Sequence, residues 1–140
     1  MFASSVKKHG CSIIFINSRE QILLLLRDDI PDIPFPGMWD LPGGHMEQRE
    51  TPEQCIRREI LEEMCIGLTD IRLFDVFDMD DRIEHTFWQR ANFIVDDIDL
   101  KEGQRIDWFS ENDLAGVELA FGFKSIVAEF FNCRPWREDR

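Results

Sequence analysis

Residues 43–66 read GGHMEQRETPEQCIRREILEEMCI, a glycine pair followed by a strongly patterned segment. This segment begins with helix-start signals: Thr51 suits the N-cap, Pro52 the first helical position and Gln54 the return half of a capping box. Together these signals predict a helix over residues 52–64. Its apolar residues recur on one side and form an inward stripe of Ile56, Ile60 and Met64.

The predicted helix also presents a concentrated acidic face. Glu62 and Glu63 follow Glu59 by three and four positions, so the three carboxylates lie on one side within about one turn. Such carboxylates repel one another unless a cation lies among them, and Mg²⁺ is commonly held by carboxylates together with substrate phosphates. Upstream, Gly43 and Gly44 let the backbone approach a ligand closely. The pattern indicates a metal and phosphate site, and the alternative is an ordinary surface helix with a solvated acidic face.

The spacing of this segment resembles the Nudix box, written G-x5-E-x7-R-E-U-x-E-E-x-G-U with U an apolar residue. Every position of that pattern but one matches, because cysteine stands where the box has its last glycine. The matching residues are Gly44, Glu50, Arg58, Glu59, Ile60, Glu62, Glu63 and Ile66.

The resemblance implies hydrolysis of a nucleoside diphosphate linked to another group X, with Mg²⁺ or Mn²⁺ as cofactor. Glu62 and Glu63 would be metal ligands, and Glu59 a further ligand or the general base. The carbonyl of Gly43 would be a backbone ligand, and Gly44 would allow close approach of the substrate. Arg58 would pair with Glu50 or with the acidic cluster and orient the ligands, although a purely structural salt bridge is equally consistent.

Three more residues resemble functional positions of MutT-type pyrophosphatases. In the segment KEGQ at residues 101–104, Glu102 corresponds to a glutamate that joins the metal site, and its alternative is a solvated loop residue. Arg27 resembles an arginine that contacts phosphate or base, or it is a surface charge at a strand end. Phe121 stands where MutT reads oxidised guanine with an asparagine, so it would stack on a base without selecting it, unless it belongs to the core.

Two departures from the family pattern concern backbone geometry. Cys65 replaces the glycine that usually ends the helix in a left-handed conformation, and we expect Gly67 to supply the cap after a slightly longer helix. Arg49 stands where many family members have glycine. Neither departure removes a carboxylate, so activity is expected to survive.

Composition restricts the range of functions. The chain has 140 residues, 44% of them hydrophobic, and a net charge of −12, which argues against binding to a nucleic-acid polymer or an anionic membrane. The apolar segment after residues 1–8 is too short for a signal peptide, and no run is long enough to span a membrane. The four cysteines form no CxxC pair, so we expect reduced and mostly buried thiols in a cytoplasmic protein.

The order of elements predicts an α+β protein. Strands are expected at residues 11–16, 21–27, 39–41, 71–78, 87–95 and 104–109, with a stiff loop at 28–38, a turn of helix at 110–114, a helix at 121–131 and a fraying tail at 132–140. This order resembles the Nudix fold, an α/β/α sandwich with a mixed β-sheet and a loop-helix-loop. It suits a single domain over residues 1–140 with a core at about residues 8–132.

Two other functions on the same fold are weighed against a nucleotide pyrophosphohydrolase. A non-catalytic nucleotide-binding Nudix domain usually lacks acidic box residues, whereas all three are present here. An isomerase of prenyl diphosphates needs a cysteine and a glutamate in an apolar pocket, and no cysteine lies in a segment assignable to that role. The expected partner is therefore a small nucleotide, and the resemblance also allows a homodimer.

Overall fold

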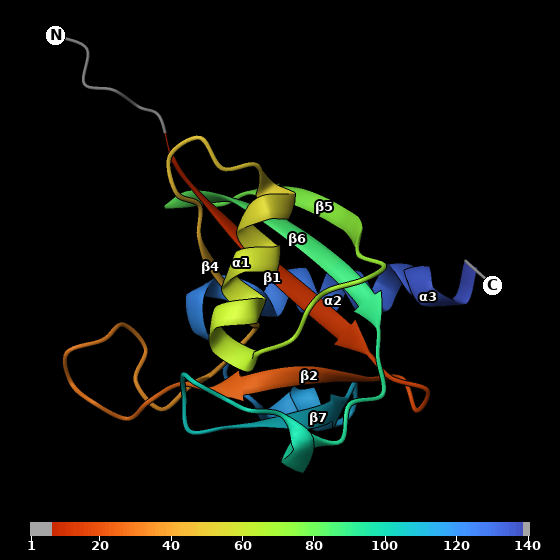
Figure 1. Cartoon of the computed structure of the whole chain (residues 1–140). Helices are drawn as coiled ribbons and strands as arrows, with labels where there is room; N and C mark the ends of the chain where they lie inside the picture. Colours follow the sequence, from red (N-terminus) through yellow and green to blue (C-terminus); the bar gives the residue numbers. More distant parts are fainter. Residues whose placement is uncertain (1–6, 139–140) are drawn as a thin grey trace, which may run out of the picture.

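The computed structural model of the protein describes residues 7–138 and shows an α+β sandwich built on a mixed sheet (Figure 1). The strands are β1 (Lys8–Ile16), β2 (Gln21–Leu26), β3 (Trp39–Asp40), β4 (Gly43–His45), β5 (Arg72–Asp78), β6 (Arg82–Arg90) and β7 (Arg105–Ser110). The helices are α1 (Pro52–Met64), α2 (Phe123–Cys133) and α3 (Pro135–Glu138). Short 3₁₀ turns lie at Val95–Asp97, Asp113–Gly116 and Ala120–Gly122. Residues 1–6 and 139–140 lie outside the described part.

The sheet runs in the order β3-β2-β1-β6-β5, with β4 also paired to β1 and β7 to β2. Only the central pair of named strands, β1 and β6, is parallel, with Lys8 opposite Arg82 and Ile16 opposite Arg90. The other strand pairs are antiparallel. The sheet is therefore mixed, as the sequence predicts.

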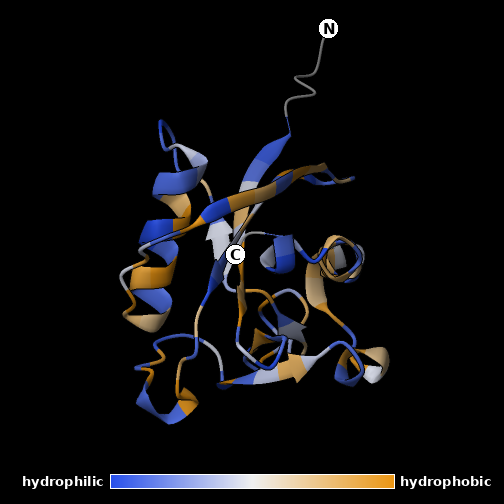
Figure 2. Cartoon of the chain, turned by 90° about the vertical axis from the view of Figure 1, so that its right-hand side faces the viewer, coloured by the Kyte–Doolittle hydropathy of each residue, from blue (hydrophilic) through white to orange (hydrophobic). Residues whose placement is uncertain are grey.

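Helices cover both faces of this sheet, with α1 on one side and α2 with α3 on the other (Figures 1 and 2). In β1, Ile13 and Phe15 belong to the core under α1, whereas Ile14 and Ile16 belong to the core under α2. Successive side chains of a strand point to opposite faces, so a strand buried on both sides is continuously apolar. This explains the uninterrupted run of isoleucine and leucine in β1 and β2.

The central helix matches the expectation closely. α1 spans Pro52–Met64, and Thr51 and Gln54 form the predicted capping box. The inward stripe of Ile56, Ile60 and Met64 is buried. Its end differs, because Cys65 itself takes the left-handed conformation (φ 56°, ψ 33°) and donates its N–H to Leu61 O. The expected longer helix with a cap at Gly67 is therefore wrong.

Three other expectations about elements need correction. β6 begins at Arg82 and ends at Arg90, earlier than the expected strand at 87–95, because it continues along β1 and buries charged residues. Gly43 and Gly44 lie in a short strand, β4, where no strand was expected. Residues 132–138 do not fray, since α3 packs Trp136 into the core under α2.

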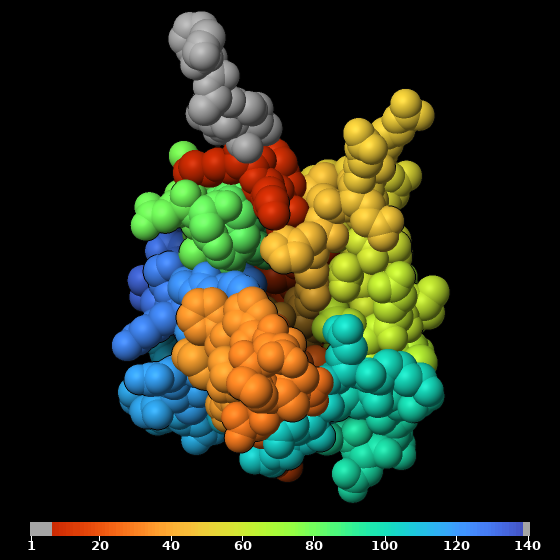
Figure 3. Space-filling model, turned by 90° about the vertical axis from the view of Figure 1, so that its left-hand side faces the viewer, coloured from red at the N-terminus to blue at the C-terminus, as the bar shows by residue number. Residues whose placement is uncertain are grey.

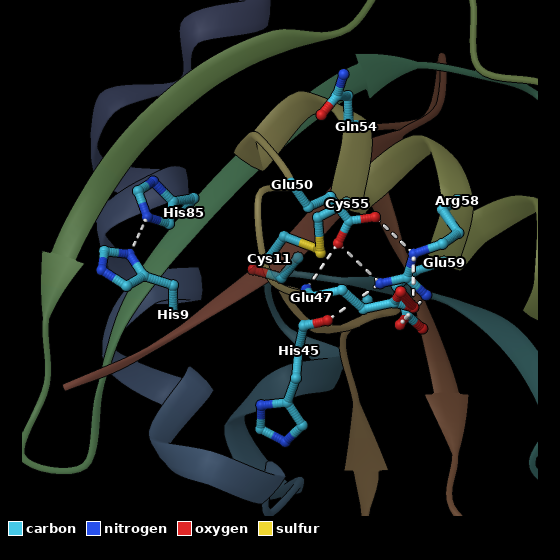
Figure 4. The surroundings of a disulfide bond; sticks show 12 residues. His9, Cys11, His45, Glu47, Glu50, Gln54, Cys55, Arg58, Glu59 and His85 are labelled. Carbon is cyan, nitrogen blue, oxygen red and sulfur yellow. Dashed lines mark hydrogen bonds and ion pairs between the residues drawn. A yellow bond between two sulfur atoms is a disulfide. The ribbon is translucent and has the colours of Figure 1, made fainter.

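The expectation about the cysteines is also wrong in part. Cys11 of β1 and Cys55 of α1 are buried, but they form a disulfide that ties the helix to the sheet (Figure 4). Cys65 and Cys133 are free thiols, and both are exposed. Pairing of residues 44 positions apart cannot be read from spacing alone.

Candidate active site

Arg58 forms ion pairs and hydrogen bonds both with the loop before α1 and with the acidic face of α1 (Figure 4). Its Nε lies 2.6 Å from Glu50 Oε2, and its Nη1 lies 2.9 Å from Glu59 Oε1 and 3.3 Å from Glu62 Oε2. Its Nη2 donates to Glu50 Oε1 and to His45 O. The hydrogen bond from Arg58 lowers the pKa of Glu50 to about 2, so this carboxylate stays ionised. The predicted pairing of Arg58 with Glu50 and with the acidic cluster is confirmed.

The two glycines let the sheet approach the acidic face of α1. The Gly43 N–H donates to Glu63 Oε1 over 3.2 Å. A Cβ atom at Gly44 would collide with the Glu59 carboxylate, and one at Gly43 would collide with the backbone of Cys11. Gly43 also has a φ of 150°, which disfavours any side chain. Both positions therefore require glycine if these carboxylates are to lie against β4.

The carboxylates of the cluster influence one another strongly. Burial, reinforced by the charges of Glu59 and Glu102, raises the pKa of Glu63 to about 9, although the Gly43 amide acts in the opposite direction. Burial also raises the pKa of Glu59, with Arg58 opposing it and the charges of Glu62 and Glu102 adding to it. Glu102 therefore lies within electrostatic reach of the cluster, although it is 39 positions beyond Glu63 in sequence.

The loop that carries Glu102 is fastened at both ends. The Lys101 N–H donates to Glu63 O over 2.7 Å, at the end of α1. The Gln104 N–H donates to Leu26 O, and its side-chain amide donates to Arg27 O. Gly103 has a φ of 83°, and a Cβ there would collide with the side chain of Leu25. These contacts hold the KEGQ loop between α1 and the end of β2, beside the acidic cluster.

The oxygen atoms of the acidic cluster and of the Gly43 carbonyl are the chemical type of ligand that binds a hard divalent cation. Carboxylate oxygens and a backbone carbonyl are the ligands that Mg²⁺ and Mn²⁺ prefer. In residues 7–138, however, no three Asp, Glu, His or Cys side chains are yet arranged around one point as metal ligands. Glu59 and Glu62 are turned toward Arg58, and Glu63 toward the Gly43 amide. A cation would have to draw these side chains from their present partners.

Arg27 and Phe121 meet although 94 positions separate them in the chain. The guanidinium carbon of Arg27 lies 4.8 Å from the Phe121 ring centroid, and its Nη1 lies 3.0 Å from Asp40 Oδ2. Arg27 is thus part of a network, not a lone surface charge. Phe121 has a φ of 56° and its ring packs edge-on against Phe35 at 4.7 Å between centroids.

Arg27, Phe121 and the two site glycines border one cavity of about 280 Å³. Figure 3 shows the hollow between the loop of residues 28–38, in orange, and the segments of β1 and β4 above it. Other aromatic side chains could also stack on a base, but Phe87 and Trp88 are buried in the core, and Trp39 packs on Phe109. Phe35, by contrast, packs against the Phe121 ring at the cavity.

Three cavity residues escaped the sequence-based interpretation. Asp40, Arg82 and Glu84 line the cavity, and Arg82 Nε lies 2.6 Å from Glu84 Oε1. Arg82 Nη2 also donates to Phe121 O. The available signal was the alternation of Arg82 and Glu84 at the start of an apolar run, which places both on one face of a strand. Charged residues are rarely buried, so the expected strand began after them.

These buried carboxyl groups have altered titration. Burial raises the pKa of Asp40 to about 6, with Arg27 and the Leu41 amide opposing it and Glu84 adding to it. Burial also raises the pKa of Glu84, against the effects of Arg82 and the Ser12 hydroxyl. The charge of Glu84 acts on Asp40, and both residues line the same cavity.

Comparisons with known proteins agree with this geometry. An 8-oxo-dGTP diphosphatase of Proteus vulgaris is 49% identical over 39 residues, which is 28% of this chain and 35% of that protein. Mouse diphosphoinositol polyphosphate phosphohydrolase 3-alpha is 28% identical over 129 residues, covering 89% of this chain and 75% of that protein. A solved MutT structure from work on Aliivibrio salmonicida and Vibrio cholerae has a TM-score of 0.73 at 27% identity, and the match covers 91% of this chain and 98% of that chain.

The shared length differs among these relatives. The match covers 32% of a Bacillus subtilis relative and 35% of the Proteus vulgaris protein, so the chain spans about a third of their length. Over residues 7–138, no helix is long and apolar enough to cross a membrane. The model of the NUDIX domain matches residues 7–130, a range that includes the capped helix, the glycine pair and the acidic cluster. This protein is a member of the Nudix family.

Proposed function

We propose that this protein is a Nudix pyrophosphohydrolase that depends on Mg²⁺ or Mn²⁺ and cleaves a nucleoside diphosphate linked to X, such as a nucleoside triphosphate. The observation that carries the proposal is the convergence of Glu59, Glu63 and Glu102 beside the Gly43–Gly44 backbone, at the edge of a cavity of about 280 Å³. Phosphates placed there would meet the acidic cluster, while the rest of the substrate extends into the cavity.

Each residue of the cluster has a proposed part. Glu62, Glu63 and the Gly43 carbonyl would hold the cation, which supplies positive charge to the phosphate oxygens when it is bound. Glu59 or Glu102 would complete the ligand set or accept the proton of the attacking water at a carboxylate oxygen. Arg58 is a positioning residue, because it contacts Glu50, Glu59 and Glu62 and so sets their directions before substrate arrives.

The cavity residues have proposed parts as well. Arg27 and Phe121 border the same space, so Arg27 would face the phosphate or the base and Phe121 would stack on the base. Gly44 would let the substrate approach the β4 backbone. We further propose that the whole chain is one Nudix domain, because both cores share a single sheet.

Two rival functions fit less well. A binding domain without catalysis would not need Glu59, Glu62, Glu63 and Glu102 together. A prenyl-diphosphate isomerase needs a cysteine that can move a proton, and the cavity-lining Cys11 is joined to Cys55. A nucleotide with its charged phosphates also suits a cavity bordered by two arginines.

The test is release of phosphate or pyrophosphate over a nucleotide panel with and without Mg²⁺. Glu62→Gln and Glu63→Gln should each lower turnover at limiting Mg²⁺ by about a hundredfold or more. The fold should persist, because Glu62 is exposed and glutamine at position 63 keeps the side-chain size and an oxygen that can accept from the Gly43 N–H. Glu53→Gln is the matched control, since Glu53 is exposed on the same helix and pairs with Arg57. Wild-type turnover by either cluster variant would refute the metal-ligand assignment.

A further inference from the structure

Two buried carboxylates line the cavity, and they come from strands on opposite sides of β1 in the sheet order. Asp40 of β3 is 7% exposed and Glu84 of β6 is 2% exposed. One oxygen of each is held by an arginine: Arg27 Nη1 lies 3.0 Å from Asp40 Oδ2, and Arg82 Nε lies 2.6 Å from Glu84 Oε1. The other oxygens, Asp40 Oδ1 and Glu84 Oε2, are buried and have no hydrogen-bond partner in the described part of the chain.

Such free oxygens are unusual. The large majority of buried polar side-chain atoms have a partner, and leaving an acceptor unsatisfied is unfavourable. Here the two exceptions belong to residues that line the same cavity. A ligand that brings N–H donors would satisfy both oxygens, whereas a ligand that brings carbonyl oxygens would meet them with repulsion.

The surroundings keep these acceptors in place. Each carboxylate is fixed by its own arginine, so the oxygen that points away from the arginine has a defined position. Glu84 fits only because residue 10 is glycine, since a Cβ there would lie 2.7 Å from Glu84 Oε1. The two arginines also neutralise the two carboxylates, so the pair calls for neutral hydrogen-bond donors and not for a cation.

An aromatic surface borders the same space. The guanidinium carbons of Arg27 and Arg82 lie 4.8 Å and 5.8 Å from the centroid of the Phe121 ring. Arg82 also holds the Phe121 carbonyl, over 2.9 Å. The arginines that fix the two carboxylates therefore also contact the ring, which brings a stacking surface and two hydrogen-bond acceptors together.

We propose that Asp40 and Glu84 are specificity residues that accept hydrogen bonds from an exocyclic amino group of the substrate's base. The enzyme then prefers an amino-bearing base over its counterpart that carries oxygen or hydrogen at the same position. This inference rests on the proposed nucleotide hydrolysis and adds the class of base. Phe121 alone would stack on any base without selecting it. The two carboxylates add hydrogen-bond acceptors to the same cavity, so the site is expected to select among bases.

The experiment compares matched bases by binding and by turnover. The pairs are cytidine with uridine, adenosine with inosine, and guanosine with inosine nucleotides, each differing at an amino position. Calorimetry gives Kd for the monophosphates, and kcat/KM is measured for the triphosphates with Mg²⁺. We expect the amino-bearing member of at least one pair to be favoured about tenfold or more, the scale of one well-placed hydrogen bond.

Variants assign that preference to the two residues. Glu84→Gln and Asp40→Asn keep the side-chain size but add an amide donor, so each should lower the preference to about threefold or less. Glu129→Gln, at an exposed position of α2, should leave it unchanged. Circular dichroism checks the fold of each variant. If Glu84→Gln fails to fold, Asp40→Asn and the wild-type panel still decide.

The outcomes separate this inference from the proposed function. Selective binding of amino-bearing nucleotides without any turnover would support the inference and overturn the hydrolase assignment. Turnover with all three pairs within about threefold in the wild type would overturn the inference and leave the hydrolase assignment standing. A wild-type preference that persists in both variants would also overturn it, as would failure of every nucleotide to bind.

Discussion

Replacing Cys65 by glycine should stabilise the protein, because this residue ends α1 in a conformation that side chains resist. Its φ of 56° and ψ of 33° are left-handed, and its N–H still donates to Leu61 O over 3.1 Å. A left-handed residue other than glycine costs roughly 1–2 kcal/mol. Glycine loses more backbone entropy on folding, which costs roughly 0.5–1 kcal/mol. The net gain for Cys65→Gly is therefore about 0.5–1 kcal/mol.

The side chain of Cys65 contributes little that would be lost. Within residues 7–138 its thiol makes one hydrogen bond, a long one of 3.7 Å from Sγ to Asp99 Oδ2 on the surface. Cys65→Ala is the matched control, because it removes the thiol but keeps the Cβ atom that causes the conflict. It should be no more stable than the wild type.

Urea denaturation followed by tryptophan fluorescence, together with thermal unfolding, measures the difference. For a chain of this size the gain corresponds to a rise in Tm of about 2–4 °C. The slope of the urea transition should stay the same in all three proteins, so that the midpoints report stability alone. A Cys65→Gly variant no more stable than Cys65→Ala would refute the conformational argument.

Four further predictions follow from the site and its surroundings. Glu102→Gln should lower kcat by roughly a hundredfold at saturating metal, the usual scale of a general base, whereas a change of only a few-fold would make Glu102 a solvated loop residue. Alkylation of the unfolded, unreduced protein should modify only Cys65 and Cys133, and mass spectrometry showing four modified cysteines would contradict the disulfide. The hydrogen bond from Arg137 lowers the pKa of Glu20 from 4.5 to about 2. The stability that this ionised carboxylate contributes is therefore present above pH 4.5 and is lost as the pH falls through 2. In Glu20→Gln, the free energy of unfolding from urea titrations should fall less steeply between pH 4.5 and 2 than in the wild type. An unchanged pH dependence would exclude Glu20 as its source. Because Phe121 cannot read a base edge as an asparagine does, kcat/KM for 8-oxo-dGTP should exceed that for dGTP by less than about a thousandfold, and a larger ratio would overturn this inference.

The features that the sequence determines by itself arise from interactions between near neighbours. The capping box of Thr51 and Gln54 and the buried stripe that starts at Ile56 lie within one helix, so their spacing predicts them directly. The same holds for the two-sided burial of β2, which follows from a run of apolar residues. The Nudix spacing likewise predicted the pairing of Arg58 with Glu50, because Glu50 lies just before the start of the helix and Arg58 lies within it, only eight positions away.

Only the tertiary structure decided which distant residues share an environment. Burial of a charge is unfavourable in isolation, so the alternation of Arg82 and Glu84 could not by itself predict that Glu84 is buried. The salt bridge of Glu84 with Arg82 makes that burial tolerable. Its meeting with Asp40 depends on sheet order, since β6 lies beside β1 while β3 lies at the sheet edge. The left-handed Cys65 has the same origin: the chain must turn at the end of α1, and the packing of that helix imposes the conformation although the residue is not glycine.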